Sequence, residues 1–232
     1  MARHFNGWTQ AASAAIGPAL SATNCATVAF WMWAESYTDP DDQMLFETGA
    51  QYDLLTTLGF ALYSNTADTW MTLRTLGADS TFSTATFDRP PTGVWAHWVF
   101  VVNRAQIPPF SLGPVYIDGM VQTLTLTPGG TSDNFPNQDF YVMARTTNFA
   151  HMAANLFDLA IWSWVLNADE VTSLANKSCR PDQVQANNLI SYWPLEGFVS
   201  PEPACGGTTG DLTLVGSPPQ INDPPGFAIA FT

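Results

Sequence analysis

The sequence predicts an all-β fold, a sandwich or a barrel, from its residue pattern and its composition. Short runs of β-branched and aromatic residues alternate with clusters of Gly, Pro, Asn and Asp along nearly the whole chain, which is typical of such folds. The chain has 232 residues, of which 46% are hydrophobic and 13% aromatic, enough to bury a core without cross-links. Only 12% are charged, about half the usual quarter, and this composition excludes a disordered chain.

Several segments are expected to form strands, because each one is rich in β-branched and aromatic residues and ends at turn residues. They are Thr27–Ala34, Met44–Gly49, Leu58–Ser64, Thr69–Thr75, Trp95–Asn103, Val115–Ile117, Gln122–Thr127, Asp139–Ala144 and Asn155–Trp164. In the first, Trp31 and Trp33 fall on one side and the apolar residues between them on the other. A strand that is apolar on both sides fits the middle of a layered sandwich, or a sheet whose outer face is covered by a loop, a ligand or a partner.

One short helix is expected near residues 168–176. Asn167 and Glu170 have the spacing of a capping box, in which each side chain accepts a backbone N–H at the helix start. Val171, Leu174 and Ala175 recur at intervals of three and four residues, as in a helix that lays one apolar stripe against a sheet.

Five segments, taken in order, carry a resemblance to a known family. They are FNG near the start, TVAFWMWAE, VWAHWVFVVN, VYIDGM and FDLAIWSWVLNADEVTSL, and the motif positions within them are Trp95, His97, Tyr116, Asp118, Gly119, Asp158, Leu166, Glu170 and Leu174. Together they resemble the laminin-G-like jelly roll of the concanavalin A-like lectin/glucanase superfamily. The resemblance covers residues 5 to about 178 and implies a jelly-roll sandwich of two antiparallel sheets. It leaves function open, because this fold hosts lectins, glycosidases, adhesion modules and structural proteins.

The domain organisation is predicted as a jelly-roll sandwich over residues 1–180 and a C-terminal extension over residues 181–232. The extension reads as a few strands connected by Gly- and Pro-rich loops. Its last residues alternate Phe227, Ile229 and Phe231 with small residues, a pattern that suits a strand added to a sheet edge. That edge belongs either to the same domain or to a neighbouring subunit, so these three residues are candidate partner contacts.

The charge balance excludes two classes of partner. Lys and Arg number 7 against 20 Asp and Glu, which gives a net charge of −13, so nucleic acid would be repelled over most of the surface. A membrane partner is not expected, because no run of about 18 apolar residues occurs and Lys177 is the one lysine. The cysteines, Cys25, Cys179 and Cys205, are too sparse for a disulfide scaffold. Buried thiols are the favoured interpretation, and a Cys179–Cys205 bridge is the alternative.

Catalysis is not expected. The resemblance implies that a glucanase of this superfamily would carry paired carboxylates at short spacing on one strand, as the retaining mechanism requires. None of the glutamates has that spacing; they are Glu35, Glu47, Glu170, Glu196 and Glu202. Glu35 and Glu47 could face one another across a loop, although a solvated pair of strand ends is the favoured interpretation. A glycosidase with an atypical carboxylate pair is the second alternative for the function. His97 is interpreted as a hydrogen-bonded structural residue.

Two groups of residues are candidates for ligand contacts. Asp39, Asp41 and Asp42 offer hard oxygen ligands at short spacing, which would suit calcium, although Asp-Pro-Asp is also ordinary turn chemistry and a turn is favoured. Trp8, Tyr52 and Trp70 lie near expected loops or strand ends and could serve as aromatic platforms for a glycan.

The sequence therefore predicts a non-catalytic module for surface display or binding. Jelly rolls of this type usually act outside cells, whereas the start of the chain lacks the pattern of a signal peptide. Assembly into a virus particle after cytosolic synthesis reconciles the two, so we expect a phage decoration or fibre-like protein, self-associating or bound to a shell protein, with glycan adhesion as a second role. The alternative is an extracellular carbohydrate-binding lectin or adhesion protein.

Overall fold

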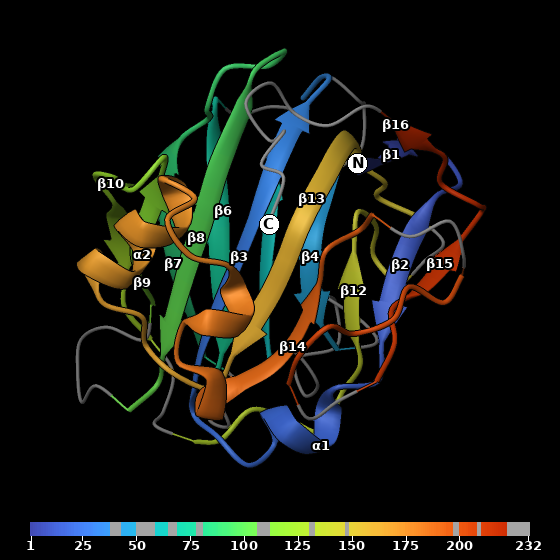
Figure 1. The fold of residues 1–232 in the computed structure, drawn as a ribbon. Helices are drawn as coiled ribbons and strands as arrows, with labels where there is room; N and C mark the ends of the chain where they lie inside the picture. The colour runs from blue at the N-terminus through green and yellow to red at the C-terminus, as the bar shows by residue number, and fades with distance from the viewer. Residues whose placement is uncertain are drawn as a thin grey trace.

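Two antiparallel sheets of eight strands each lie face to face in the computed structural model (Figure 1). This arrangement confirms the predicted all-β jelly-roll sandwich. The structure describes residues 1–37, 43–49, 59–64, 69–77, 81–105, 112–129, 133–146, 149–196, 200–207 and 210–221.

Sheet A has the order β10-β9-β8-β3-β13-β1-β16, and β14 also pairs with β13. Its strands are β1 (Ala2–Asn6), β3 (Cys25–Ala34), β8 (Trp95–Asn103), β9 (Leu112–Ile117), β10 (Met120–Val121), β13 (Ala153–Trp162), β14 (Leu189–Trp193) and β16 (Gln220–Ile221). The two-residue turn between β9 and β10 consists of Asp118 and Gly119, both with positive φ, 51° and 78°. Such a turn matches the twist of a hairpin, which explains the Asp-Gly pair.

Sheet B has the order β11-β7-β6-β5-β4-β12-β2-β15. Its strands are β2 (Ala11–Ala14), β4 (Gln43–Thr48), β5 (Phe60–Ser64), β6 (Trp70–Leu76), β7 (Phe82–Asp88), β11 (Thr125–Thr127), β12 (Phe140–Val142) and β15 (Thr213–Val215). The sequence did not predict β1, β2 or β7. Small and hydroxyl residues dominate β2 and β7, and their strand conformation depends on neighbouring strands rather than on local propensity.

The core lies between the sheets and is rich in aromatic rings. Phe46 of β4 meets Phe30 of β3 and Phe100 of β8 across the interface, with ring centroids 6.2 and 5.5 Å apart. In β3 and β8, alternate side chains point into this core, as the period of two in a strand requires.

The outer face of sheet A is partly covered by the chain's own helix. Helix α2 (Ala168–Ala175) begins at the predicted capping box: the Asn167 side chain accepts the Asp169 and Glu170 N–H groups, and Glu170 accepts the Asn167 N–H at 2.8 Å. Val171 and Leu174 of α2 then pack in one buried cluster with Val99 of β8. The other helices are α1 (Gly17–Leu20) and two single 3₁₀ turns, Pro181–Gln183 and Ala186–Asn188. Across the described ranges, no helix has the length and apolarity needed to cross a membrane.

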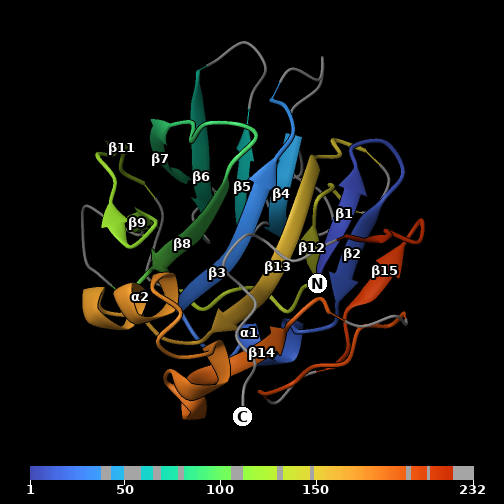
Figure 2. The ribbon, with the colours of Figure 1, turned by 45° about the horizontal axis from the view of Figure 1, so that its top comes forward.

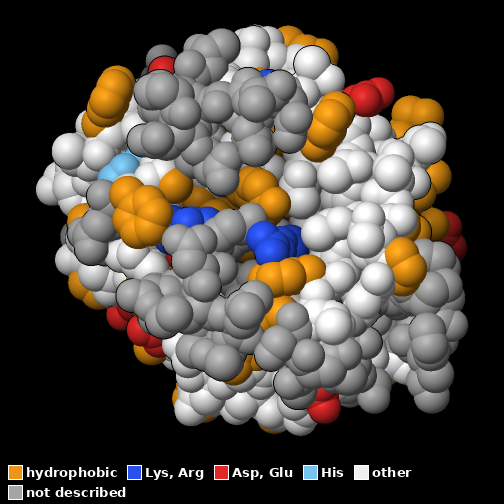
Figure 3. Space-filling model, turned by 180° about the vertical axis from the view of Figure 1, so that it is seen from behind, with side chains coloured by type: hydrophobic (Ala, Val, Ile, Leu, Met, Phe, Trp, Pro, Cys, Tyr) orange, Lys and Arg blue, Asp and Glu red, His pale blue; other side chains and the backbone are white. Residues whose placement is uncertain are grey.

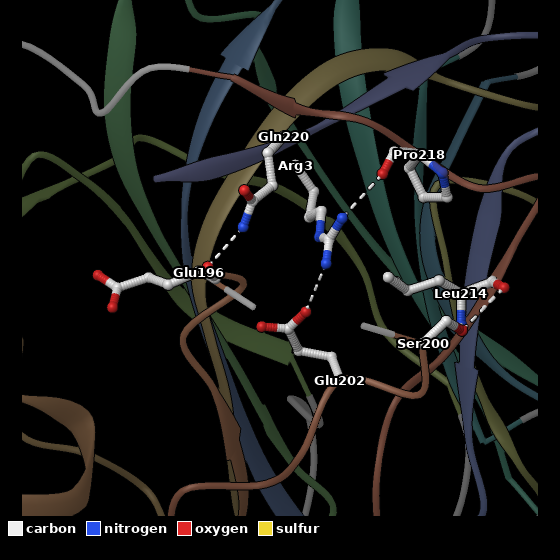
Figure 4. A network of polar contacts seen from close by, with 7 residues as sticks. All are labelled: Arg3, Glu196, Ser200, Glu202, Leu214, Pro218 and Gln220. Carbon is white, nitrogen blue, oxygen red and sulfur yellow. Dashed lines mark hydrogen bonds and ion pairs between the residues drawn. The ribbon is translucent and has the colours of Figure 1, made fainter. Parts of the chain in front are cut away.

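The described part of the C-terminal extension contributes strands to both sheets. Strand β14 pairs with β13, β15 pairs with β2, and β16 pairs with β1. The last strands thus flank the first ones: Figure 1 labels β16 beside β1, and Figure 2 shows β15 beside β2. A buried ion pair joins the two ends of the described chain: Arg3 Nη2 lies 3.0 Å from Glu202 Oε2, and Arg3 Nη1 donates to the Pro218 carbonyl at 3.1 Å (Figure 4).

Candidate functional site

Two of the predicted aromatic platforms are described, and the structure does not bring them together. Trp8 is 73% exposed in the turn before β2, and Trp70 is 42% exposed at the start of β6. Strands β12, β4 and β5 separate β2 from β6, so the strands adjoining the two rings are roughly 19 Å apart at about 4.8 Å per strand. The remaining candidates lie outside the described residues: Tyr52, the possible calcium ligands Asp39, Asp41 and Asp42, and the partner contacts Phe227, Ile229 and Phe231.

Neither a metal cluster nor a disulfide is found in the part of the chain that the structure describes. No three His, Cys, Asp or Glu side chains within that part gather closely enough to hold a metal ion. Cys25, Cys179 and Cys205 are free thiols, and burial raises the pKa of Cys179 and of Cys205. Raised pKa values keep both thiols protonated and unreactive near neutral pH.

The suggested pairing of Glu35 with Glu47 is wrong, because the two residues belong to different sheets. Glu35 follows β3 of sheet A, and its Oε1 lies 3.1 Å from His4 Nδ1. Glu47 lies in β4 of sheet B and is fully buried. They therefore do not form a carboxylate pair, and Glu47 is not the solvated strand end that the sequence favoured.

His97 has a structural environment. Its backbone N–H donates to Asp118 Oδ1 at 2.8 Å, and its ring packs 5.1 Å from Trp31. Burial, and to a smaller extent the charge of Lys177, lowers the pKa of His97 to about 3. The ring is consequently neutral at physiological pH and unable to serve as a cationic group.

A row of outward-facing side chains crosses the middle of sheet B. Strand pairing places its members opposite one another on adjacent strands, while their chain neighbours face the core; from β7 to β2 they are Thr84, Arg74, Ala61, Glu47, Tyr141 and Ser13. We call this set the sheet B row. Burial, and then the charges of Asp139 and Glu47, raises the pKa of Tyr141, so its hydroxyl remains a hydrogen-bond donor.

Glu47 holds an arginine and an aromatic ring over the sheet B row. Its Oε2 lies 3.7 Å from Arg145 Nε, and its Oε1 accepts the Thr146 N–H at 3.0 Å. The Arg145 guanidinium lies 5.3 Å from the centre of the Phe149 ring, and Phe149 is 51% exposed. Burial raises the pKa of Glu47 to about 7, against the opposing influence of Arg145 and the Thr146 N–H. A buried carboxyl thus positions a solvent-facing aromatic ring through an arginine.

A second arginine–aromatic pair lies on the same face. The Arg74 guanidinium is 3.2 Å from the centre of the Phe82 ring, and Phe82 and Tyr63 pack against a buried outer cluster that includes Met44 and Leu76. Figure 3 shows this side of the molecule, where basic side chains lie among hydrophobic ones in a depression near the centre. Aromatic surface and hydrogen-bonding groups therefore occur side by side on sheet B, the combination found in small-molecule sites.

Comparison with known proteins identifies the family from the fold and the sequence together. Residues 6–172 match the model of the concanavalin A-like lectin/glucanases superfamily. The chain belongs to this superfamily. No curated protein matches the sequence.

The concanavalin A-like domain is also similar to solved structures at low sequence identity. One is the receptor binding domain of botulinum neurotoxin C/D mosaic serotype, with 10% identity and a TM-score of 0.53 over 76% of this chain and 45% of that one. Another is the botulinum neurotoxin serotype G binding domain, with 14% identity and a TM-score of 0.50 over 68% and 37% of the two chains. The domain spans less than half the length of either structure, and the likeness establishes a shared fold.

Sequence reasoning missed Phe149, Arg145 and Tyr141. Tyr141 carries a usable signal, because it alternates with the apolar Phe140 and Val142 within an expected strand. Arg145 and Phe149 follow that strand in an irregular segment, where no periodicity indicates which side chains meet.

Proposed function

We propose that the chain is a non-catalytic binding module that takes a carbohydrate on the outer face of sheet B. The observation that carries the proposal is the half-exposed Phe149 ring, which lies against Arg145. Arg145 in turn contacts the buried Glu47, which is paired with Tyr141 in the sheet B row. The C–H groups of a sugar ring suit the negative face of an aromatic ring, and sugar hydroxyls suit neighbouring phenol and hydroxyl groups. The similar solved structures are binding domains of botulinum neurotoxin, which agrees with a binding role.

The proposal excludes glycoside hydrolysis because the usual mechanisms require two carboxyl groups on either side of the scissile bond. Among the described residues, the charged group that influences the pKa of Glu47 is Arg145, not a second carboxylate. A single carboxyl with a pKa near 7 could donate a proton, but hydrolysis would also need a second carboxyl on the other side of the bond as nucleophile or base. We therefore expect no release of reducing sugar from any glycan that binds.

A glycan array followed by titration calorimetry tests the proposal. Phe149→Ala is expected to lower the affinity for the best-binding glycan by about tenfold, equivalent to about 1.4 kcal/mol. The thermal midpoint should change little, because the Phe149 ring is half exposed. Trp164→Ala is the matched control, since Trp164 is 47% exposed and follows β13 of sheet A. A protein that binds no glycan, or that loses equal affinity with both substitutions, contradicts the proposal.

The virion location, self-association and the extracellular alternative stay predictions of the sequence. Sedimentation of the full chain, alone and mixed with virus capsids, tests self-association and capsid binding separately from glycan binding. Recovery of the chain as a free monomer that does not associate with any particle would count against the virion prediction while leaving the carbohydrate proposal intact.

A further inference from the structure

The outer face of sheet A is divided into a covered part and a partly exposed part. At one end, α2 and the segment after it bury Val99 and Trp162. At the other end, where β3 finishes, a row of four side chains runs across four adjacent strands: His4 of β1, Asn155 of β13, Trp33 of β3 and Trp95 of β8. We call these four residues the tryptophan row.

Strand register fixes the direction and the spacing of the tryptophan row. His4 pairs with Asn155, Asn155 with Trp33, and Trp33 with Trp95. Each residue of the row has at least one chain neighbour in the core between the sheets, so the row itself faces outward. These neighbours are Phe5, Ala154, Leu156, Met32, Ala34 and Ala96. Three strand spacings make the row roughly 14 Å long, with two indole rings at one end and two polar side chains at the other.

The polar end of the row is already ordered by its own contacts. His4 Nδ1 lies 2.9 Å from Asn155 Oδ1 and 3.1 Å from Glu35 Oε1. These contacts use Oδ1 of Asn155 and Oε1 of Glu35, so the Asn155 NH₂ group can donate to a ligand and Glu35 Oε2 can accept from one. The Glu35 side chain is 37% exposed. All four residues of the row are partly exposed.

The next row toward the covered end provides a rigid base. Phe157, Trp31 and His97 are buried there, in register with one another across β13, β3 and β8. The Lys177 ammonium lies 4.8 Å from the centre of the Trp31 ring. Trp31 and Phe157 belong to a buried cluster with Ala2, against which Trp95 packs. The indole rings of the tryptophan row therefore adjoin a close-packed surface that cannot easily rearrange.

We propose that the tryptophan row, with Glu35, is a second ligand site and that its ligand is a neutral oligosaccharide. The indole faces would stack on sugar rings, and the amide and the carboxylate would donate to and accept from the hydroxyls. A neutral sugar is favoured over an acidic one because Glu35 lies at the site and the chain carries a net charge of −13, which repels anions. This site is independent of the carbohydrate proposed for sheet B, since the two faces point away from each other.

The test is titration calorimetry of the full chain with cellohexaose, xylohexaose and maltohexaose, and with oligogalacturonate as the acidic comparison. We expect at least one neutral hexamer to bind and the acidic one to bind at least tenfold more weakly. Trp95→Ala should weaken neutral binding by about tenfold or more. Glu35→Gln should lower the affinity for the neutral hexamer severalfold and reduce the difference in affinity between neutral and acidic oligosaccharides. Because Glu35 is partly exposed, this substitution should not impair folding.

Two substitutions separate this proposal from the one for sheet B. Phe149→Ala should leave binding at the tryptophan row unchanged, and so should Trp164→Ala, because Trp164 lies near Thr27, roughly 20 Å along β3 from Trp33. The proposal is overturned if no neutral hexamer binds at millimolar concentration, if oligogalacturonate binds better, or if Phe149→Ala and not Glu35→Gln removes the binding. Binding of an apolar peptide in place of every sugar also overturns it.

Discussion

Two arginine–glutamate pairs are equally buried in this molecule, yet they are built differently. The side chains of Arg3 and Glu202 are 7% and 3% exposed, and those of Arg145 and Glu47 are 8% and 0% exposed. Arg3 and Glu202 approach to 3.0 Å, and Arg3 also donates to a backbone carbonyl. Arg145 and Glu47 are 3.7 Å apart. Burial alone therefore does not decide the role of a pair: the short contact between Arg3 and Glu202 suits a structural tie, and the longer one between Arg145 and Glu47 suits the support of a surface group.

The largest expected effect comes from breaking the tighter pair. Glu202→Ala should lower the free energy of unfolding by about 3–5 kcal/mol, because it leaves the Arg3 guanidinium buried without its counter-charge. Urea unfolding followed by fluorescence measures the change.

The double variant Arg3→Met with Glu202→Met sharpens this result. Replacing both charges with apolar side chains of similar volume should restore most of the lost stability. If the double variant is as unstable as Glu202→Ala, the loss comes from packing and not from the uncompensated charge.

The pair of Arg145 and Glu47 should affect how the stability of the protein depends on pH. Burial raises the pKa of Glu47 from 4.5 to about 7, so between these pH values the folded state binds more protons than the unfolded state. The Glu47 contribution to stability then falls as pH rises through this window and levels off above it. In the unmodified protein, Asp158, whose pKa burial also raises to about 7, adds to this fall, whereas His97, whose pKa burial lowers to about 3, opposes it below pH 6.5.

Glu47→Gln isolates the contribution of Glu47. Between pH 4.5 and 7, the variant should gain stability relative to the unmodified protein by on the order of 2 kcal/mol. Urea midpoints measured at several pH values give the difference. Parallel pH profiles for the two proteins would contradict the assignment.

The smallest effect is expected from a third pair, which lies nearer the solvent. Arg180 Nη2 is 2.9 Å from Asp182 Oδ2, and these side chains are 39% and 27% exposed. Asp182→Asn should change the free energy of unfolding by less than about 1 kcal/mol, because solvent and salt screen such a pair. A loss as large as that of Glu202→Ala would reverse the order proposed here.

Much of the fold could be predicted because the informative signals are local. The capping box at Asn167 and Glu170 located α2 within one residue of its end, and the apolar alternation of residues 95–103 matched β8. The order of weak motifs then indicated the family. Strand β2, with the sequence AASA, has no such signal, because pairing with β12 and β15 makes it a strand.

The candidate sites were harder to predict because they depend on register between distant strands. The tryptophan row joins His4 to Trp95 through two intervening strands, and nothing in the sequence near either residue indicates that alignment. Trp33 and Trp95 were visible as members of expected strands, but an indole on a sandwich strand more often packs in a core. Likewise, the sequence drew attention to Glu47 as a candidate acidic residue, but its partner Arg145 comes from a segment without periodicity, so their contact could not be predicted.

The position of β1 and β2 has a consequence for synthesis of the chain. β1 lies between β13 and β16, and β2 lies between β12 and β15. The first two strands of a nascent polypeptide therefore leave the ribosome without their pairing partners, which are synthesised only after more than half of the message has been translated. Such high contact order slows folding and exposes unpaired strand edges meanwhile, so translation rate and chaperone supply should affect the yield of this protein more than the strength of any single contact.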